Sequence, residues 1–176
     1  MNSKLLRKIH IYLSLICFSF LFLFCFTAIS LNHPTWFSTE ASVKQQHISV
    51  TEHKPSTYII ALTANNIELS QSQAKQLLAN SELTIASPGK RTDLYIDNEN
   101  SVIEVIHTNF GVIAMLNELH QNRHTPALWT LVSDVIAAII MLICISGTWL
   151  SLKHKAQRRR YLYLLAASTV ALITMA

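Results

Sequence analysis

Hydrophobic and polar positions divide the chain into long apolar runs near its two ends and a stretch of mixed polarity between them. The apolar runs cover residues 9–31, 125–152 and 161–176, whereas residues 32–124 have the composition of a water-soluble domain. The pattern predicts a membrane protein. We expect an α-helical anchor of two or three transmembrane helices that carries one small α+β domain in water.

The first apolar run predicts a transmembrane helix at residues 9–31, preceded by a short N-terminal segment, residues 1–8. No charged residue occurs from Ile11 to Leu31, and a helix of that length matches a hydrocarbon core of roughly 30 Å. A cleaved signal peptide is the alternative, because basic residues precede the run. The run is longer than the usual signal-peptide core of roughly 7–15 residues, which favours an anchor.

The second and third runs differ in length. Residues 125–152 carry Asp134 and then a long uncharged stretch, which predicts a second transmembrane helix. Residues 161–176 would form a helix of only about 24 Å. That segment fits a short third span, a tilted interfacial helix or an incomplete span.

Basic residues predict the orientation of the helices. They precede the first run at Lys4, Arg7 and Lys8, and they fill the loop of residues 153–160 after the second. Positive charge near the membrane stays in the cytoplasm, so residues 32–124 are expected to be periplasmic or extracellular. The net charge of +4 therefore indicates topology and contact with the lipid bilayer, and no nucleic-acid partner is expected.

The outer domain is expected to alternate strands and helices. Strands are predicted at residues 45–50, 58–62, 83–86, 92–97 and 101–108, and helices at residues 70–79 and 110–120. Turn residues separate the last three strands, which indicates a hairpin or meander. All three cysteines lie in the apolar runs, so no disulfide framework is expected in this domain.

Histidines at the ends of the predicted spans are the main candidates for chemistry: His10, His33, His120, His124 and His154. Each membrane face then has at least one histidine from each helix, and pairs of imidazoles on facing helices could ligate the iron of haem b. His120 and His124 would share one face of a continuous helix, unless Asn122 interrupts it. Interfacial histidines without any cofactor are the alternative. No cysteine or carboxylate cluster completes a zinc site.

Asp134 is the one acidic residue within the predicted second span. A carboxylate there needs a partner, because a charge in the hydrocarbon costs roughly 2–3 kcal/mol. It could orient a ligand histidine from the second coordination shell, or it could form a polar contact between helices. The chain carries no hydrolase signature and no phosphate-binding loop, so a nucleotide-dependent catalytic domain is not expected.

Two segments resemble the PepSY-associated transmembrane family. They are LRKIHIYLSLICFSFLFLFCFTAISLNH and LNELHQNRHTPALWTLVSDVIAAIIMLICISGTWL. The second segment contains Leu119-His120, Arg123-His124-Thr125, Trp129, Asp134 and Ser146-Gly147 in the order in which such residues recur in the family. Asn122 stands where a glycine is common, a mild departure because asparagine tolerates left-handed backbone.

The resemblance implies a bacterial inner-membrane protein with an extracytoplasmic PepSY-like domain, in a family whose larger members include haem-containing ferric-siderophore reductases. It favours His10, His33, His120 and His124 as ligands, whereas His154 rests on the topology alone. The expected function is a haem b electron-transfer component, a ferric-reductase-like oxidoreductase or a subunit of one, that reduces an outer acceptor such as a ferric chelate. A non-catalytic module that binds or regulates a redox partner or receptor protein is the alternative. A homo-oligomer could supply ligands that one chain lacks.

Overall fold

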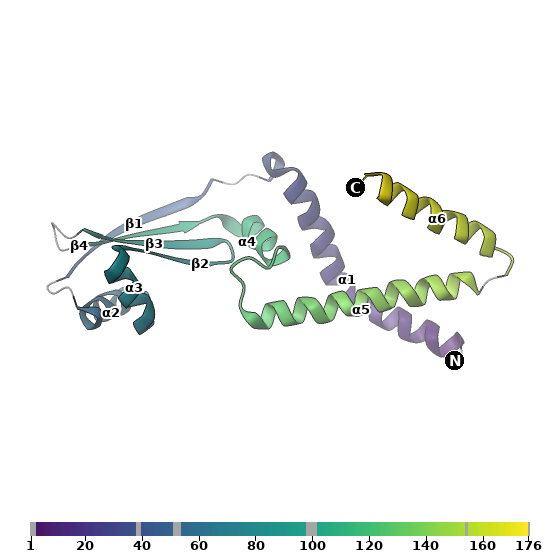
Figure 1. Ribbon diagram of the computed structural model, residues 1–176, viewed down its shortest axis with the longest axis horizontal. Coiled ribbons are helices and arrows are strands. Elements are labelled where there is room, and N and C mark those ends of the chain that lie inside the picture. The colour runs from purple at the N-terminus through teal and green to yellow at the C-terminus, as the bar shows by residue number, and fades with distance from the viewer. Residues whose placement is uncertain (1–2, 38–39, 51–53, 98–101, 154, 176) are drawn as a thin grey trace. The chain divides into compact units, whose positions relative to one another are not determined.

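The computed structural model describes residues 3–37, 40–50, 54–97, 102–153 and 155–175. The chain forms two compact units (Figure 1). One unit combines Met1–Phe24 with Ala127–Ala176, and the other consists of Cys25–Pro126. Helix α1 (Ser3–Asn32) begins in the first unit and ends in the second.

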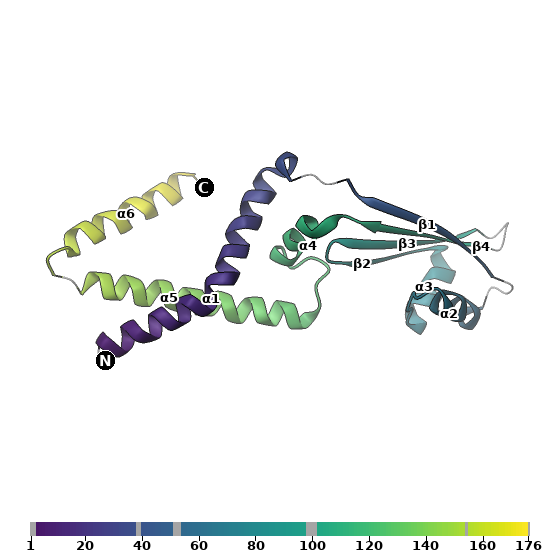
Figure 2. The same cartoon turned by 180° about the vertical axis from the view of Figure 1, so that it is seen from behind.

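The first unit contains the apolar helices. Besides the N-terminal part of α1 it holds α5 (Ala127–Leu152) and α6 (Arg158–Met175). By length and composition α1 and α5 could cross a membrane, with mean hydropathies of 2.3 and 2.5 over their most apolar windows. The rings of Phe20 on α1 and Trp129 on α5 stack with centroids 6.2 Å apart, and α1 crosses α5 in both views (Figure 2). Both predicted long helices are therefore present.

Helix α6 is less apolar than α1 and α5. Three arginines, residues 158–160, occupy its first turn. Among the described helices, only α1 and α5 are long and apolar enough to cross a membrane. A third transmembrane helix at residues 161–176 therefore stays a prediction. So does the orientation predicted from the basic loop.

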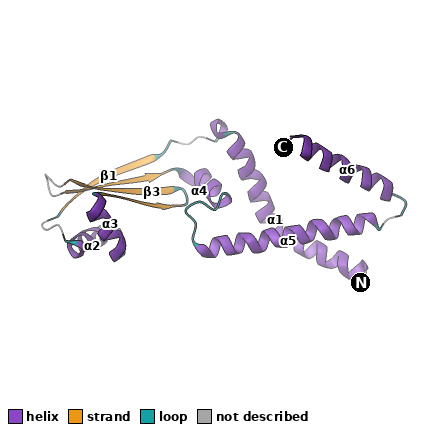
Figure 3. Ribbon diagram, viewed as in Figure 1, coloured by secondary structure: helices purple, strands orange, loops and turns teal. Residues whose placement is uncertain are grey.

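The second unit is an antiparallel sheet with helices (Figure 3). After the last turns of α1 and a 3-10 turn at Pro34–Trp36, its elements are β1 (Ser42–Ser49), α2 (Pro55–Ala64), α3 (Gln71–Asn80), β2 (Glu82–Ser87), β3 (Lys90–Asp97), β4 (Val102–Asn109) and α4 (Gly111–His120). The strands lie in the order β1-β4-β3-β2. Strands β2, β3 and β4 form the predicted meander, and β1 closes the sheet beside β4.

The core of this unit lies between one end of the sheet and the helices α2 and α3. Leu94 on β3 pairs with Leu83 on β2 and Val105 on β4, so the three side chains share one face of the sheet. Tyr58 and Leu62 from α2 and Leu77 from α3 complete a buried cluster with them. Burying each such side chain stabilises the fold by about 1.5–3 kcal/mol.

Local signals explain where the elements begin and end. Ser70 caps α3: its hydroxyl accepts a hydrogen bond from the backbone amide of Gln73, and the backbone amide of Ser70 donates one to Oε1 of the Gln73 side chain. The turn between β2 and β3 contains Gly89 at φ +72°, and a Cβ there would lie 2.7 Å from Cβ of Met115. The Gly89 amide donates to Oε2 of Glu118 over 2.7 Å. The glycine thus lets this turn pack against α4.

One predicted strand is wrong. Residues 58–62 lie within α2, which begins at Pro55 in the first helical turn after an extended Lys54. Tyr58 and Leu62 are buried one helical turn apart, the spacing that puts two side chains on one face of a helix. The remaining predicted strands and helices of this unit are present, with ends shifted by a few residues at most.

Candidate functional site

His10 on α1 contacts the second long helix through its ring. Its Nδ1 lies 2.9 Å from Oγ of Ser146 on α5. The same hydroxyl can donate to the carbonyl oxygen of Ile143, which lies 3.0 Å from Oγ. The contact with Ser146 engages Nδ1 of His10, so Nε2 is the ring nitrogen left to bind a metal.

Two further features shape the surroundings of His10. A Cβ built on Gly147 would lie 3.1 Å from Cε1 of His10 and 3.7 Å from its Nε2, so the glycine gives the ring room. A cavity of about 480 Å³ lies between α1 and α5 beside Ser146. Its remaining lining is apolar: Leu6, Ile9, Leu13, Leu142, Ile145 and Trp149. The site therefore combines an oriented histidine with an apolar cavity.

A second histidine contact joins the last turns of α1 to α4. Nδ1 of His120 lies 2.6 Å from Oγ1 of Thr27, and Nδ2 of Asn117 donates to Oγ of Ser30 over 3.1 Å. Thr27 and Ser30 are 0% and 1% exposed. We call these four residues the α1–α4 seam. In the seam, two polar contacts between α1 and α4 lie one helical turn apart.

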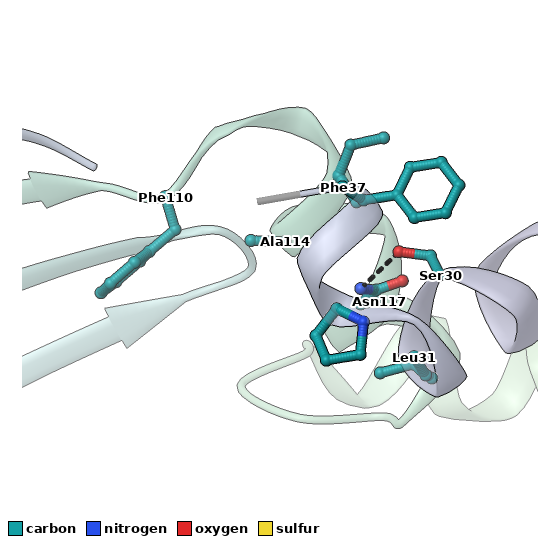
Figure 4. A pocket seen from close by; sticks show the side chains of 8 residues that line it. Ser30, Leu31, Phe37, Phe110, Ala114 and Asn117 are labelled. Carbon is teal, nitrogen blue, oxygen red and sulfur yellow. Dashed lines mark hydrogen bonds between the residues drawn. The ribbon is translucent and has the colours of Figure 1, made fainter. Parts of the chain in front are cut away.

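A cavity of about 250 Å³ adjoins the seam (Figure 4). It is lined by Ser30, Leu31, Pro34, Phe37, Phe110, Ile113, Ala114 and Asn117. Oδ1 of Asn117 is buried without a hydrogen-bond partner among the described residues, although Nδ2 of the same amide is bonded. A buried acceptor without a partner costs about 1–3 kcal/mol. A ligand that donates a hydrogen bond would remove that cost.

The other predicted ligands lie in different surroundings. His33 is exposed at the start of the 3-10 turn, where its ring stacks on Trp36 with centroids 4.1 Å apart. His124 is exposed and has φ +56°. His120 and His124 do not share a helical face, because α4 ends at His120 and Asn122, the residue expected to interrupt the helix if it is not continuous, adopts φ +54°. Asn122 thus adopts the left-handed backbone conformation that suits the glycine common at this position in the family, as expected for asparagine.

His154 and Asp134 stay predictions. His154 lies outside the described residues. Asp134 is exposed on α5, and no hydrogen bond or ion pair of its side chain is recorded within the described part of the chain. Within the same part, no group of three or more histidine, cysteine, aspartate and glutamate side chains is arranged to hold a metal ion.

Sequence reasoning missed the polar seam. Of its four residues only His120 was singled out from the sequence. A usable signal exists, because Thr27 and Ser30 on α1 and Asn117 and His120 on α4 are each spaced by three residues. This spacing places each pair on one helical face.

Two long apolar helices and a small α+β unit define a membrane protein with a compact domain of its own. The model of the PepSY_TM-like family matches residues 3–176 of the chain. The chain therefore belongs to the PepSY_TM-like family, as the two sequence segments predicted. No curated protein and no solved structure matches the chain.

Proposed function

We propose that this PepSY_TM-like protein is a membrane electron-transfer component in which His10 is an axial ligand of haem b. Electrons would pass to an acceptor outside the cytoplasm, such as a ferric chelate. The observation that supports this proposal best is the contact between Nδ1 of His10 and Oγ of Ser146, which orients the ring and leaves Nε2 for the iron.

The residues around His10 fit a haem. Haem b bound there would supply reversible one-electron transfer, with its potential set by the axial ligand and its surroundings. Ser146 holds the imidazole in one orientation, as hydrogen-bonded neighbours of ligand histidines do. The apolar lining of the adjacent cavity excludes water. Gly147 leaves space beside the ring that any larger residue would narrow.

A second axial ligand would come from His154 or from His10 of a second copy of the chain. The histidine–hydroxyl pair of Thr27 and His120 is the corresponding candidate near the other end of α1. His33, stacked on Trp36, and His124, in the loop after α4, are weaker candidates because neither ring is held by a helix–helix contact.

The test is an absorbance spectrum of the detergent-purified full-length chain, produced with ample haem. We expect a reduced-minus-oxidised spectrum typical of b-type haem that is lost in His10→Ala. Ser146→Ala should keep the bands but weaken haem affinity by about 10–100-fold, the usual effect of removing a ligand's hydrogen-bond partner. His47→Ala, an exposed histidine on β1, is the matched control and should change nothing.

Two results would contradict the proposal. One is a folded wild-type chain that stays colourless with haem supplied. The other is a haem spectrum that His10→Ala leaves as strong as that of the wild type. Circular dichroism of each variant separates loss of haem from loss of fold.

The cavity beside the seam favours a second function, a non-catalytic module that binds a partner protein. A hydrogen-bond donor of the partner would pair with the buried Oδ1 of Asn117. In that case a photo-crosslinking phenylalanine analogue at position 37 should capture the partner in cells. Asn117→Leu should abolish the crosslink, whereas His10→Ala should leave it unchanged.

A further inference from the structure

The face of the sheet that carries the core is covered at one end only. Helices α2 and α3 lie against the end where Leu94, Ile103 and Ile48 are buried. At the other end, which we call the open end, β1 and β3 begin and β4 ends, and α4 follows β4 and packs on the β2–β3 turn at Gly89 (Figures 1 and 2). Residues of the same face continue onto this open end and form a polar surface there.

The strand register places six polar residues on the open end in two rows. Lys44, His107 and Thr92 lie side by side across β1, β4 and β3. The next row, two residues along each strand, consists of Ser42, Asn109 and Lys90. Side chains on one face of a sheet repeat every second residue, so both rows belong to the face that carries the core.

These six residues line a cavity of about 270 Å³. Thr92 and His107 are half-buried, and Nδ1 of His107 lies 3.0 Å from Oγ1 of Thr92. Lys44 and Lys90 are exposed and come from the two strands that flank β4. Neighbouring strands lie about 4.8 Å apart and each residue advances a strand by about 3.4 Å. The two lysines stand two strands apart and two residues apart along the strands, so their backbones are about 12 Å apart. Both side chains are long enough to reach a ligand between them.

The cavity has positive charge and no negative charge in its lining. Arg91 and Thr108 complete the lining, but alternation along the strands directs their side chains to the opposite face. There the Arg91 guanidinium pairs with Asp93 over 2.8 Å and lies 5.9 Å from the centre of the Phe110 ring. The positive charge of the cavity therefore rests on Lys44 and Lys90.

We propose that this cavity binds an oxyanion, through the carboxylate or phosphate oxygens of its ligand. Every side chain of the two rows can donate a hydrogen bond, and none is a carboxylate that would compete for the lysines. Hydrogen bonds from charged donors to anionic oxygens are short and about twice as strong as neutral ones. Two lysines on opposite sides match a ligand whose negative charge is spread over several oxygens.

Two sources could supply such oxygens: a small soluble anion, or the phosphate of a phospholipid headgroup. The cavity lies near the start of β1, about ten residues after the end of α1, and the last turns of that span belong to the same compact unit. Soluble citrate and inorganic phosphate represent the first source, and phosphatidylglycerol represents the second.

The experiment uses the full-length chain in a neutral detergent. Isothermal titration calorimetry with citrate and with inorganic phosphate measures the soluble source. Native mass spectrometry after exchange into nanodiscs of equal phosphatidylglycerol and phosphatidylcholine measures retained lipid. Lys44→Gln and Lys90→Gln should each weaken binding about tenfold, the effect of losing one charged hydrogen bond. Lys75→Gln, an exposed lysine on α3 of the same unit, is the matched control.

Binding of citrate or phosphate that falls in both cavity variants, but not in Lys75→Gln, would support a soluble ligand. Selective retention of phosphatidylglycerol with the same dependence on the two lysines would support the headgroup. The proposal is overturned if neither kind of anion binds. It is also overturned if all three glutamine variants bind as the wild type does. His10→Ala should bind the anion normally, so this result is separate from haem binding.

Discussion

Thr27→Val tests whether the α1–α4 seam holds α4 in place. Valine has nearly the shape of threonine but lacks the hydroxyl that lies 2.6 Å from Nδ1 of His120. The substitution therefore removes one of the two polar contacts of the seam and leaves the apolar packing in place. The neighbouring contact between Ser30 and Asn117 is unchanged.

The size of the effect follows from burial. Thr27 is 0% exposed and His120 is half-buried, so water replaces the lost partner of His120 only in part. Leaving one buried polar group without its partner costs about 1–3 kcal/mol. The local opening of α4 should then become about 5–150 times more frequent, since each 1.4 kcal/mol is a factor of about ten.

Hydrogen exchange of the full-length chain, measured by mass spectrometry on peptides that cover α4, reports this opening. Thr27→Ser keeps the hydroxyl and should lose less protection than Thr27→Val. Thr130→Val replaces an exposed threonine on α5 and should leave exchange in α4 unchanged. If Thr27→Val exchanges in α4 as slowly as the wild type does, the seam does not stabilise this helix and our reasoning is refuted.

Three further predictions concern the stability of the α+β unit, measured by denaturant unfolding. Gly89→Ala should destabilise it by about 1–3 kcal/mol, because a side chain at φ +72° would lie too close to Met115; equal stability would contradict this packing. Leu94→Ala should cost about 2–5 kcal/mol, since Leu94 is 0% exposed in the core, and a loss below that range would show that the core adjusts. Burial raises the pKa of Tyr58 above 10.0, so its contribution is complete below pH 10.0 and is lost as pH rises through the folded-state pKa. Tyr58→Phe should reduce the alkaline loss of stability, and an equal loss in both chains would contradict this assignment.

Much of the fold could be predicted from the sequence, because its signals are local. The long uncharged runs predict α1 and α5, and turn residues such as Pro88-Gly89 separate the strands of the meander. The segment around Tyr58 misled the prediction because a short apolar run fits a strand and a helix equally well. Pro55 decides in favour of the helix, since its fixed φ suits a first turn.

The candidate sites were less predictable, because their geometry depends on contacts between distant segments. The sequence indicates that His10 and His120 are candidate ligands, but their partners Ser146 and Thr27 follow only from how the helices pack. The cavity between Lys44 and Lys90 was harder still to predict. The two lysines come to lie on either side of β4 only through the register of three strands.

Both candidate ligand histidines contact a hydroxyl of a neighbouring helix through the same ring atom. Nδ1 of His10 lies 2.9 Å from Oγ of Ser146, and Nδ1 of His120 lies 2.6 Å from Oγ1 of Thr27. Such a contact fixes the orientation of the ring and leaves Nε2 as the nitrogen that can bind a metal ion. The surroundings of the two rings differ, because only the contact of His10 adjoins an apolar cavity of about 480 Å³ with room for a large apolar cofactor. His10 is therefore the stronger of the two ligand candidates.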